Sequence, residues 1–286
     1  VLLFYFMTGL WIWKKNGQNR HIRISLAYVI MIILIWIPMA RRKSLAFLDV
    51  GQGDCFVADT KSGAIIFDGG SSSEDQVGRY RILPYMKYLG YQKIQIAVIS
   101  HMDIDHYSGI KELLEMGKIK YLGLPEIPKD ETMKKIIGIA KKRGTTIFYL
   151  SRGRQITTKD GSLKVLHPQK NSQMEKNAAS LVMQGKILGY RVLLTGDVEK
   201  EGEEELLSEE LERADILKAA HHGSKNSTSN EFLQKVQPKQ TVISCGKQNR
   251  YGHPHLETIH RLQTYHTKIY RTDRSGAIIF FKRRDG

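Results

Sequence analysis

Seven residues in the first half of the chain constrain its fold more than any other stretch. Residues 100–106 read SHMDIDH, and they directly follow an apolar run, residues 94–99, that is typical of a buried strand. A tight loop at the end of a strand can turn alternate side chains towards one point. The first His–Asp pair can then face one metal ion and the second pair another, because imidazole and carboxylate together suit Zn, Mn or Fe. The candidate ligands are His101, Asp103, Asp105 and His106.

Three further groups of Asp and His come directly after apolar runs that read as strands. Asp68 follows the first run, Asp197 follows the second, and the pair His221 and His222 follows the third. A carboxylate at Asp197 can bridge two metals, although Gly196-Asp197 alone can equally be a turn. One of the two histidines can be a ligand while the other orients it or contacts substrate. The alternative is that residues 100–106 are a polar loop that holds two His and two Asp by coincidence. Coincidence explains poorly why Asp or His also follows three other predicted strands.

Short apolar runs alternate with helical patterns throughout residues 44–286, which indicates a layered α/β fold. Helices are expected at residues 79–89, 109–116, 131–142, 200–211, 231–236 and 256–265. Strands are expected at residues 45–50, 56–59, 64–67, 94–100, 146–150, 163–166, 180–184, 190–195, 216–220, 241–244, near 269, and at 277–281.

Residues 1–43 do not have the pattern of a globular domain. Residues 1–13 are almost wholly apolar, residues 24–39 carry no charge, and basic residues flank the second segment on both sides. We therefore predict a membrane segment at 1–43, formed by two transmembrane helices of which the first is truncated, before a domain at 44–286. A signal peptide is the alternative. The flanking basic residues nearly balance, so they do not fix the orientation.

The charge balance points to a polyanionic partner. The formal net charge is +15, and proteins this basic meet nucleic acid, anionic lipid or similar polymers. The alternative is that the charge serves solubility alone. Cys55 and Cys245 are the two cysteines, too few for a disulfide scaffold, and we predict that both are buried in strands.

Several motifs, in order, resemble a known family. Asp68, residues 101–106, Asp197 and His222 resemble the motifs of the metallo-β-lactamase superfamily. More narrowly, the chain resembles the C-terminal domain of the ComEC family, the DNA-uptake channel proteins of competent bacteria. The segments that carry this closer resemblance are residues 49–54 (DVGQGD), 177–182 (NAASLV), 194–197 (LTGD), 221–229 (HHGSKNSTS) and 251–255 (YGHPH).

The resemblance implies an αβ/βα four-layer sandwich, preceded by membrane helices, with two divalent metal ions, Mn or Zn, at one edge. The first site would hold His101, Asp103 and Asn177, with His167 as an outside candidate for the third ligand. Asp103 stands where the superfamily usually has histidine, which favours Mn over Zn. The second site would hold Asp105, His106 and His222, or His221 in its place, with Asp197 bridging and Asp68 in support.

The implied function is a metal-dependent DNA phosphodiesterase that degrades the strand that is not imported. Asp105 would receive or position the proton of the attacking water, and His253 would protonate the leaving oxygen, unless it is only a turn residue held by Pro254. Ser224 and Lys225 would hold a neighbouring phosphate. Asp49 and Asp54 lie in a glycine-rich loop that we place at the edge of the site.

The expected partners are DNA, the membrane and other components of the DNA-uptake machinery. The expected location is the cell membrane, as an integral protein with the hydrolase domain on the extracytoplasmic side. Three rivals stay open: a hydrolase of a thioester, lactone or choline-phosphate ester; a non-catalytic module that guides DNA along the channel; and an intracellular, membrane-tethered nuclease.

Overall fold

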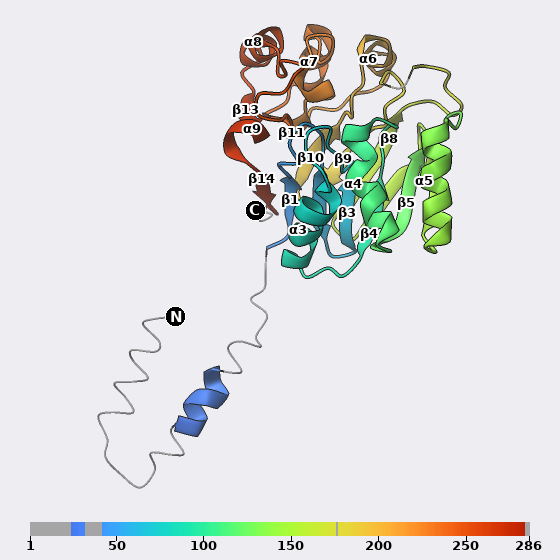
Figure 1. The fold of residues 1–286 in the computed structure, drawn as a ribbon. Helices are drawn as coiled ribbons and strands as arrows, with labels where there is room; N and C mark the ends of the chain where they lie inside the picture. The colour runs from blue at the N-terminus through green and yellow to red at the C-terminus, as the bar shows by residue number, and fades with distance from the viewer. Residues whose placement is uncertain (1–23, 32–41, 176, 284–286) are drawn as a thin grey trace. The chain divides into compact units, whose positions relative to one another are not determined.

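The computed structural model describes residues 24–31, 42–175 and 177–283 (Figure 1). The chain divides into two compact units, Val1–Arg42 and Lys43–Gly286. In the first unit, residues 24–31 form a helix. Within the described residues, no helix has the length and apolar character that crossing a membrane requires. The predicted segment 1–13 and most of the segment 24–39 lie outside the described residues, so the membrane helices stay a prediction.

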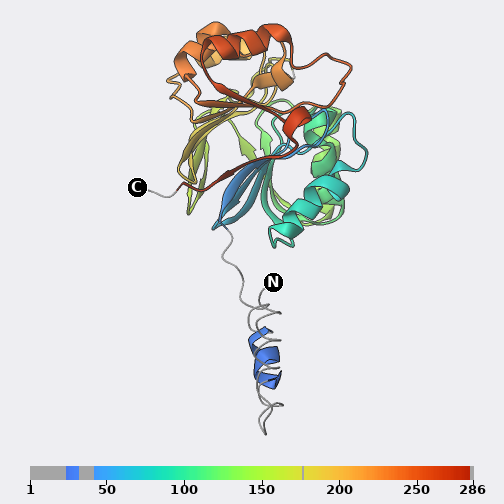
Figure 2. The ribbon, with the colours of Figure 1, turned by 90° about the vertical axis from the view of Figure 1, so that its left-hand side faces the viewer.

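Two seven-stranded sheets form the centre of the second unit (Figure 2). The first sheet has the strand order β14 (Ile278–Phe281), β1 (Ser44–Phe47), β2 (Phe56–Thr60), β3 (Gly63–Phe67), β4 (Ile94–Val98), β5 (Ile119–Pro125) and β6 (Thr146–Leu150). The second has the order β13 (Lys268–Arg271), β12 (Gln240–Ile243), β11 (Ile216–Lys218), β10 (Tyr190–Leu194), β9 (Val182–Ile187), β8 (Gly161–His167) and β7 (Gln155–Thr158).

Helices cover the outer face of each sheet and complete four layers (Figure 1). The first sheet carries α3 (Leu83–Tyr88), α4 (Ile104–Glu115) and α5 (Glu131–Lys142), and the second carries α6 (Lys200–Leu207), α7 (Asn230–Val236) and α8 (Leu256–Thr264). A short turn of helix, α9 (Thr272–Ser275), precedes β14. The predicted αβ/βα sandwich of two sheets is thereby confirmed.

The apolar side chains sort into three clusters because side chains alternate along a strand. In β1, Leu45 and Phe47 pack between the two sheets, whereas Ala46 faces the helices of the first sheet. In β11, Ile216 joins the cluster between the sheets, and Leu217 joins the cluster beneath the helices of the second sheet. A strand with two buried faces thus packs against helices on one face and against the other sheet on the opposite face.

Helix α4 begins earlier than the sequence predicts. It starts at Ile104 rather than at residue 109, so Asp105 and His106 lie in its first turn and not in a loop. Asp103 is the residue before the helix and has extended backbone, with φ −98°. A tight loop throughout residues 101–106 is therefore wrong in detail: the second His–Asp pair sits on the start of a helix, whose geometry fixes the spacing of the two side chains.

Three other elements, α6, β11 and β5, differ from the prediction. Helix α6 ends at Leu207 rather than at residue 211, and β11 spans only Ile216–Lys218 rather than 216–220. Strand β5 was not predicted, since Gly123 and Pro125 are residue types that strands usually avoid. Both cysteines are buried, as predicted, and free, but neither lies in a strand: Cys55 precedes β2 and Cys245 follows β12.

Parallel strands bring their carboxyl ends to one edge of the domain. Strands β3, β4, β5 and β6 run parallel in the first sheet, and β10, β11, β12 and β13 run parallel in the second. Segments that follow such strands meet at the same edge, which is where open α/β sheets place ligands. The candidate ligands follow β3, β4, β10 and β11.

Gly70, in the loop after β3, lies against the backbone of the first turn of α4. A Cβ added to Gly70 would lie 2.6 Å from both the carbonyl carbon of Asp105 and the amide nitrogen of His106. We expect Gly70→Ala to lower the free energy of unfolding by about 1–3 kcal/mol, because the backbone of α4 must shift.

The control is Gly138→Ala, in the exposed face of α5, where an added Cβ meets nothing within 4 Å. It should raise stability by about 0.4–1 kcal/mol through lower unfolded-state entropy. Urea unfolding of both variants checks this, and equal effects in the two variants would contradict it.

Candidate metal centre

Asp68 fixes the orientation of His106. Its Oδ2 lies 2.9 Å from His106 Nδ1, and its Oδ1 accepts a hydrogen bond of 2.7 Å from the Ser100 amide. All three residues are fully buried. Asp68 also has left-handed backbone, with φ 56°. An acid held this way sets which ring nitrogen of its histidine stays free, an arrangement common behind metal ligands. The free atom here is Nε2.

His222 is oriented in the same manner by a backbone group. Its Nδ1 donates to the carbonyl oxygen of Ser244 over 2.9 Å, which again leaves Nε2 free. His221 and His222 both have left-handed backbone, with φ 46° and 52°. Two successive non-glycine residues in this region cost about 1–3 kcal/mol each. The surrounding structure tolerates this strain. The turn directs the two rings towards the strand ends.

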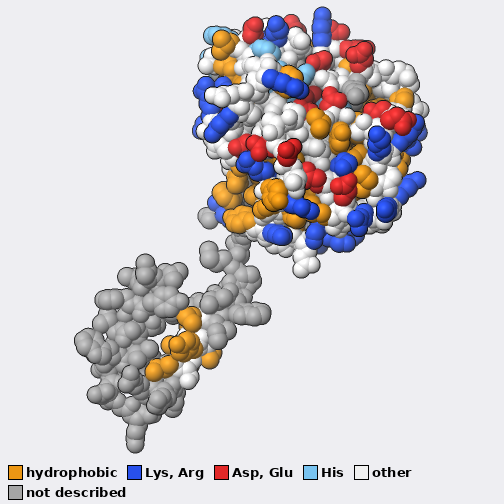
Figure 3. All heavy atoms as spheres, in the orientation of Figure 1, with side chains coloured by type: hydrophobic (Ala, Val, Ile, Leu, Met, Phe, Trp, Pro, Cys, Tyr) orange, Lys and Arg blue, Asp and Glu red, His pale blue; other side chains and the backbone are white. Residues whose placement is uncertain are grey.

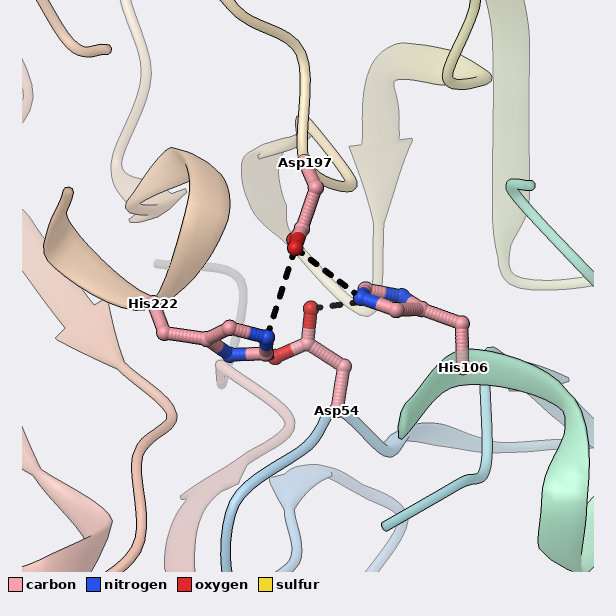
Figure 4. A group of neighbouring side chains, drawn as sticks. All are labelled: Asp54, His106, Asp197 and His222. Atoms are coloured by element: carbon pink, nitrogen blue, oxygen red, sulfur yellow. Dashed lines mark ion pairs between the residues drawn. The ribbon is translucent and has the colours of Figure 1, made fainter. Parts of the chain in front are cut away.

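The free nitrogen atoms meet at Asp197 (Figure 4). Asp197 Oδ2 lies 3.2 Å from His106 Nε2 and 3.3 Å from His222 Nε2. Asp105 Oδ2 lies 3.3 Å from the same His222 atom. Donor atoms of Asp54, His106, Asp197 and His222 all lie within 4.8 Å of one another, and all four residues are buried. This spacing and this set of nitrogen and oxygen donors fit a divalent cation.

The charges of these groups fit a cation as well. Burial alone would lower the pKa of His106 and His222, yet the carboxylate of Asp197 raises both pKa values well above the usual range, helped by Asp68 at His106 and Asp54 at His222. Burial opposes the ionisation of Asp197, but the two histidines hold its pKa well below the usual range. Protons therefore sit on the histidines in this arrangement, and a metal ion can take their place.

His101 and Asp103 stand beside this cluster. The His101 ring lies 4.1 Å from the His106 ring, and its Nδ1 contacts the hydroxyl oxygens of Ser100 and Ser180 at 3.0 and 3.2 Å. Its Nε2 is buried without a hydrogen bond and lies 3.7 Å from Asp103 Oδ2. Asp103 is much more open, with 38% of its side chain exposed. The structure thus brings together two predicted members of the first site.

Asn177, the third predicted member, lines a separate cavity that it shares with Asp103. Glu175, Glu199 and Glu201 line the same cavity together with Lys200, so carboxylates outnumber the basic group on this side of the site. His167, the outside candidate, lies away from the cluster. Its Nε2 is 2.6 Å from the Ala178 carbonyl oxygen and its Nδ1 is 2.9 Å from Glu205 Oε2, so both nitrogens are engaged.

A cavity of about 260 Å³ opens over the cluster. Asp105, Asp197 and His222 form part of its wall, so a molecule in the cavity would touch the candidate ligands directly. The remaining lining residues are Gln52, Ser72, Asp103, Ile104, His221, Tyr251 and His253.

His253 and His221 occupy different positions on this wall. Burial, then the neighbouring His222 and His221, lower the pKa of His253 to about 4, so its ring is neutral at pH 7. It must gain a proton before it can donate one. His221 is bound at Nδ1 by Glu199 Oε1 over 2.7 Å, and its Nε2 lies 3.8 Å from Asp197. The structure therefore places His222 inside the cluster and His221 at its side.

The other predicted residues lie around the cavity but do not line it. Asp49 Oδ1 accepts the Gly51 amide within the glycine-rich loop. Ser224 is buried and its hydroxyl oxygen accepts the Asn226 amide, whereas Lys225 is exposed next to it. Asp54, at the end of the glycine-rich loop, lies within the cluster itself.

Lys218 is a site residue that was not predicted from the sequence. It is the last residue of β11, and its buried ammonium contacts Asp54 and lies 3.3 Å from Asp197 Oδ1. Among the buried side chains of residues 42–175 and 177–283, it is the sole lysine or arginine. The signal was present: a lysine inside the apolar run 216–220 can be buried only with a carboxylate partner.

Comparisons with known proteins show which family the chain resembles. The Metallo-beta-lactamase superfamily profile matches residues 48–247. ComE operon protein 3 of Bacillus subtilis is 35% identical over all of this chain and 40% of its own length. Competence protein ComA of Neisseria gonorrhoeae is 30% identical over 83% of this chain and 32% of its own length. The chain thus spans well under half the length of these relatives.

Solved structures share the fold at low sequence identity. The metallo-beta-lactamase fold protein YhfI of Bacillus subtilis has a TM-score of 0.55 at 13% identity, covering 82% of this chain and 99% of that one. CmlA, a diiron beta-hydroxylase of Streptomyces venezuelae, has a TM-score of 0.54 at 10% identity, covering 94% of this chain and 58% of that one.

Weakening the contact between Asp68 and His106 should lower the affinity of the site for metal. We expect Asp68→Asn to weaken Mn²⁺ binding about 10- to 100-fold, as for other groups that orient a ligand from behind. Isothermal titration calorimetry measures the change.

Asp59→Asn is the matched control. Asp59 is a buried aspartate that pairs with Lys43 and Tyr91 instead, so its removal should lower stability but leave Mn²⁺ affinity unchanged. Unchanged affinity in Asp68→Asn would show that His106 does not need this acid to bind metal.

Proposed function

The chain belongs to the metallo-β-lactamase superfamily through a domain of the ComEC type, and we propose that this domain is a metal-dependent phosphodiesterase that cleaves DNA during uptake by competent cells. The observation that carries the proposal is the meeting of buried imidazole nitrogens and carboxylate oxygens on the wall of an open cavity. A charged phosphodiester can enter such a cavity and reach these groups.

The proposed ligands divide into two groups. Asp105, His106 and His222 would hold one divalent ion, with Asp197 shared, and His101, Asp103 and Asn177 would hold a second, Mn or Zn. Bound metal would lower the pKa of water and neutralise phosphoryl oxygens. The carboxylates support two ions, because Lys218 offsets only one of them. The group of His101, Asp103 and Asn177, which is the predicted first site, is richer in oxygen donors and favours Mn.

Asp105 is the proposed proton acceptor for the attacking water. Burial opposes its ionisation, yet its hydrogen bond with His222 and the charge of His106 keep its pKa below the usual value. It is therefore ionised at neutral pH and faces the cavity. His253, neutral in the free site, would first have to take a proton from solvent before passing it to the leaving oxygen.

Basic side chains around the cavity support DNA as the substrate. The loop after β12 supplies Tyr251 and His253 to the cavity wall, and it carries the exposed Lys247 and Arg250. Lys225 is exposed on the neighbouring loop, and its amide contacts His255. Lysine and arginine are otherwise spread over the visible face of the domain in Figure 3. Phosphate backbones are bound by such charges without regard to sequence.

The biological setting is part of the same proposal. The relatives named as competence proteins support a place in DNA uptake at the cell membrane. There the domain would lie on the extracytoplasmic side, work with other uptake components and degrade the strand that is not imported. Asp103, which is partly exposed and stands where the superfamily usually has histidine, favours one competing role, a DNA-guiding module whose first metal site is degenerate.

Cleavage of linear DNA by the purified chain with Mn²⁺ tests the activity. We expect Asp105→Asn to lower the rate about 10²- to 10⁴-fold, the usual contribution of a general base. Asp160→Asn, a carboxylate bound to Lys282 and the Lys61 amide away from the cavity, should keep the rate. DNA binding without cleavage under Mn²⁺ or Zn²⁺ would favour the guiding module.

The salt dependence of DNA binding tests the basic rim. We expect Arg250→Ala and Lys225→Ala each to reduce the slope of log affinity against log salt by about 1, one lost phosphate contact apiece. Lys134→Ala, an exposed lysine of α5 paired with Glu131, is the control. Fluorescence anisotropy at several salt concentrations gives the slopes, and equal slopes in all three variants would place the DNA elsewhere.

A further inference from the structure

Lys218 lies at the back of the metal cluster, away from the cavity. Its Nζ contacts Asp54 Oδ2, lies 3.3 Å from Asp197 Oδ1 and donates to the Gly196 carbonyl oxygen over 2.8 Å. It does not line the cavity over the cluster. One ammonium group thus holds both the side chain and the backbone of the turn that presents Asp197.

Asp54 approaches the histidine rings from the same side. Its oxygens lie 3.7 Å from His106 Nδ1 and 3.6 Å from His222 Nδ1. Both Nδ1 atoms already have shorter partners at 2.9 Å, Asp68 and the Ser244 carbonyl. Asp54 therefore faces the oriented side of each ring, whereas Asp105 and Asp197 face the free Nε2 atoms. Distance alone would make Asp54 a metal ligand, but its contacts are those of an ion pair.

We propose that Asp54 and Lys218 form a fixed internal ion pair, that Lys218 positions Asp197, and that Asp54 is not a metal ligand. The inference rests on the metal-binding part of the proposed function and is independent of DNA cleavage. The Lys218 ammonium lies against Asp54, so its charge offsets that of the buried carboxylate without a metal ion.

The two oxygens of Asp197 have different contacts. Oδ1 is held by Lys218, and Oδ2 faces His106 Nε2 and His222 Nε2. The Asp197 amide is also fixed, since it donates to Ser180 Oγ over 3.3 Å. Lys218 is thus a positioning residue, which leaves Asp197 a single oxygen for the metal.

Metal titration separates a ligand from a positioning residue. We expect Asp197→Asn to weaken Mn²⁺ binding by calorimetry more than about 100-fold, and Asp54→Asn by less than about 10-fold, below the usual effect even of groups that orient ligands. If Asp54→Asn weakens binding as much as Asp197→Asn, Asp54 is a ligand and the inference falls. If the wild-type chain binds neither Mn²⁺ nor Zn²⁺, the proposed function fails instead.

A stability cycle on metal-free protein tests the pair without any metal. Asp54→Asn removes the nearest counter-ion of Lys218, and Lys218→Met removes that of Asp54, so each should lower the melting temperature by about 10 °C. The double variant removes both charges and should recover most of that loss. A double variant that loses the sum of the two single effects would overturn the pairing.

The electronic spectrum of bound Co²⁺ tests the positioning of Asp197. Lys218→Met releases Oδ1 of Asp197, so the ligand-field bands of Co²⁺ should shift in position and intensity. Asp54→Asn, which leaves Lys218 in contact with Asp197, should keep the wild-type spectrum. A spectrum of Lys218→Met identical to wild type would show that the ammonium does not orient this carboxylate.

Discussion

The neutralisation of carboxylates that have been taken out of water is the constraint on which this structure depends. Asp54, Asp68 and Asp197 are all buried at one edge of the domain, where an unpaired charge would be severely destabilising. Lys218 supplies one permanent positive charge, and protonated histidines supply others that a divalent cation can replace. The excess of negative charge would destabilise the fold if it stayed unpaired. The same excess makes this edge of the domain a candidate metal site.

The fold makes this concentration of charge possible by dividing its construction between two halves. Each sheet contributes parallel strands whose ends meet the ends of the other sheet's strands. The first half supplies Asp68 and His106, and the second supplies Asp197 and His222. Left-handed backbone at Asp68 and at His222 aims these side chains inward. The local strain is tolerated because two packed sheets hold both ends of every loop.

Sequence patterns predicted the parts of this arrangement that depend on local chemistry. The helix at 131–142 was predicted with its observed bounds, and in the structure the Asp130 side chain caps it. Strand ends likewise pointed to His106, Asp197 and His222. The role of Lys218 escaped prediction because it depends on Asp54, a distant residue in the sequence that only tertiary packing brings near. The early start of α4 was missed because its first turn contains Asp105 and His106, which were assigned to a loop of metal ligands.

Strand β14 has a consequence for how the domain is made in the cell. It pairs with β1 in the first sheet, after all the strands of the second sheet have been laid down, and the Lys282 amide donates to the Lys43 carbonyl oxygen beside it. During synthesis the outer edge of β1 therefore stays open until nearly the whole domain has left the ribosome. Unpaired edges of this kind invite association with other chains. The nascent domain must accordingly be protected, or be folded late, rather than sheet by sheet.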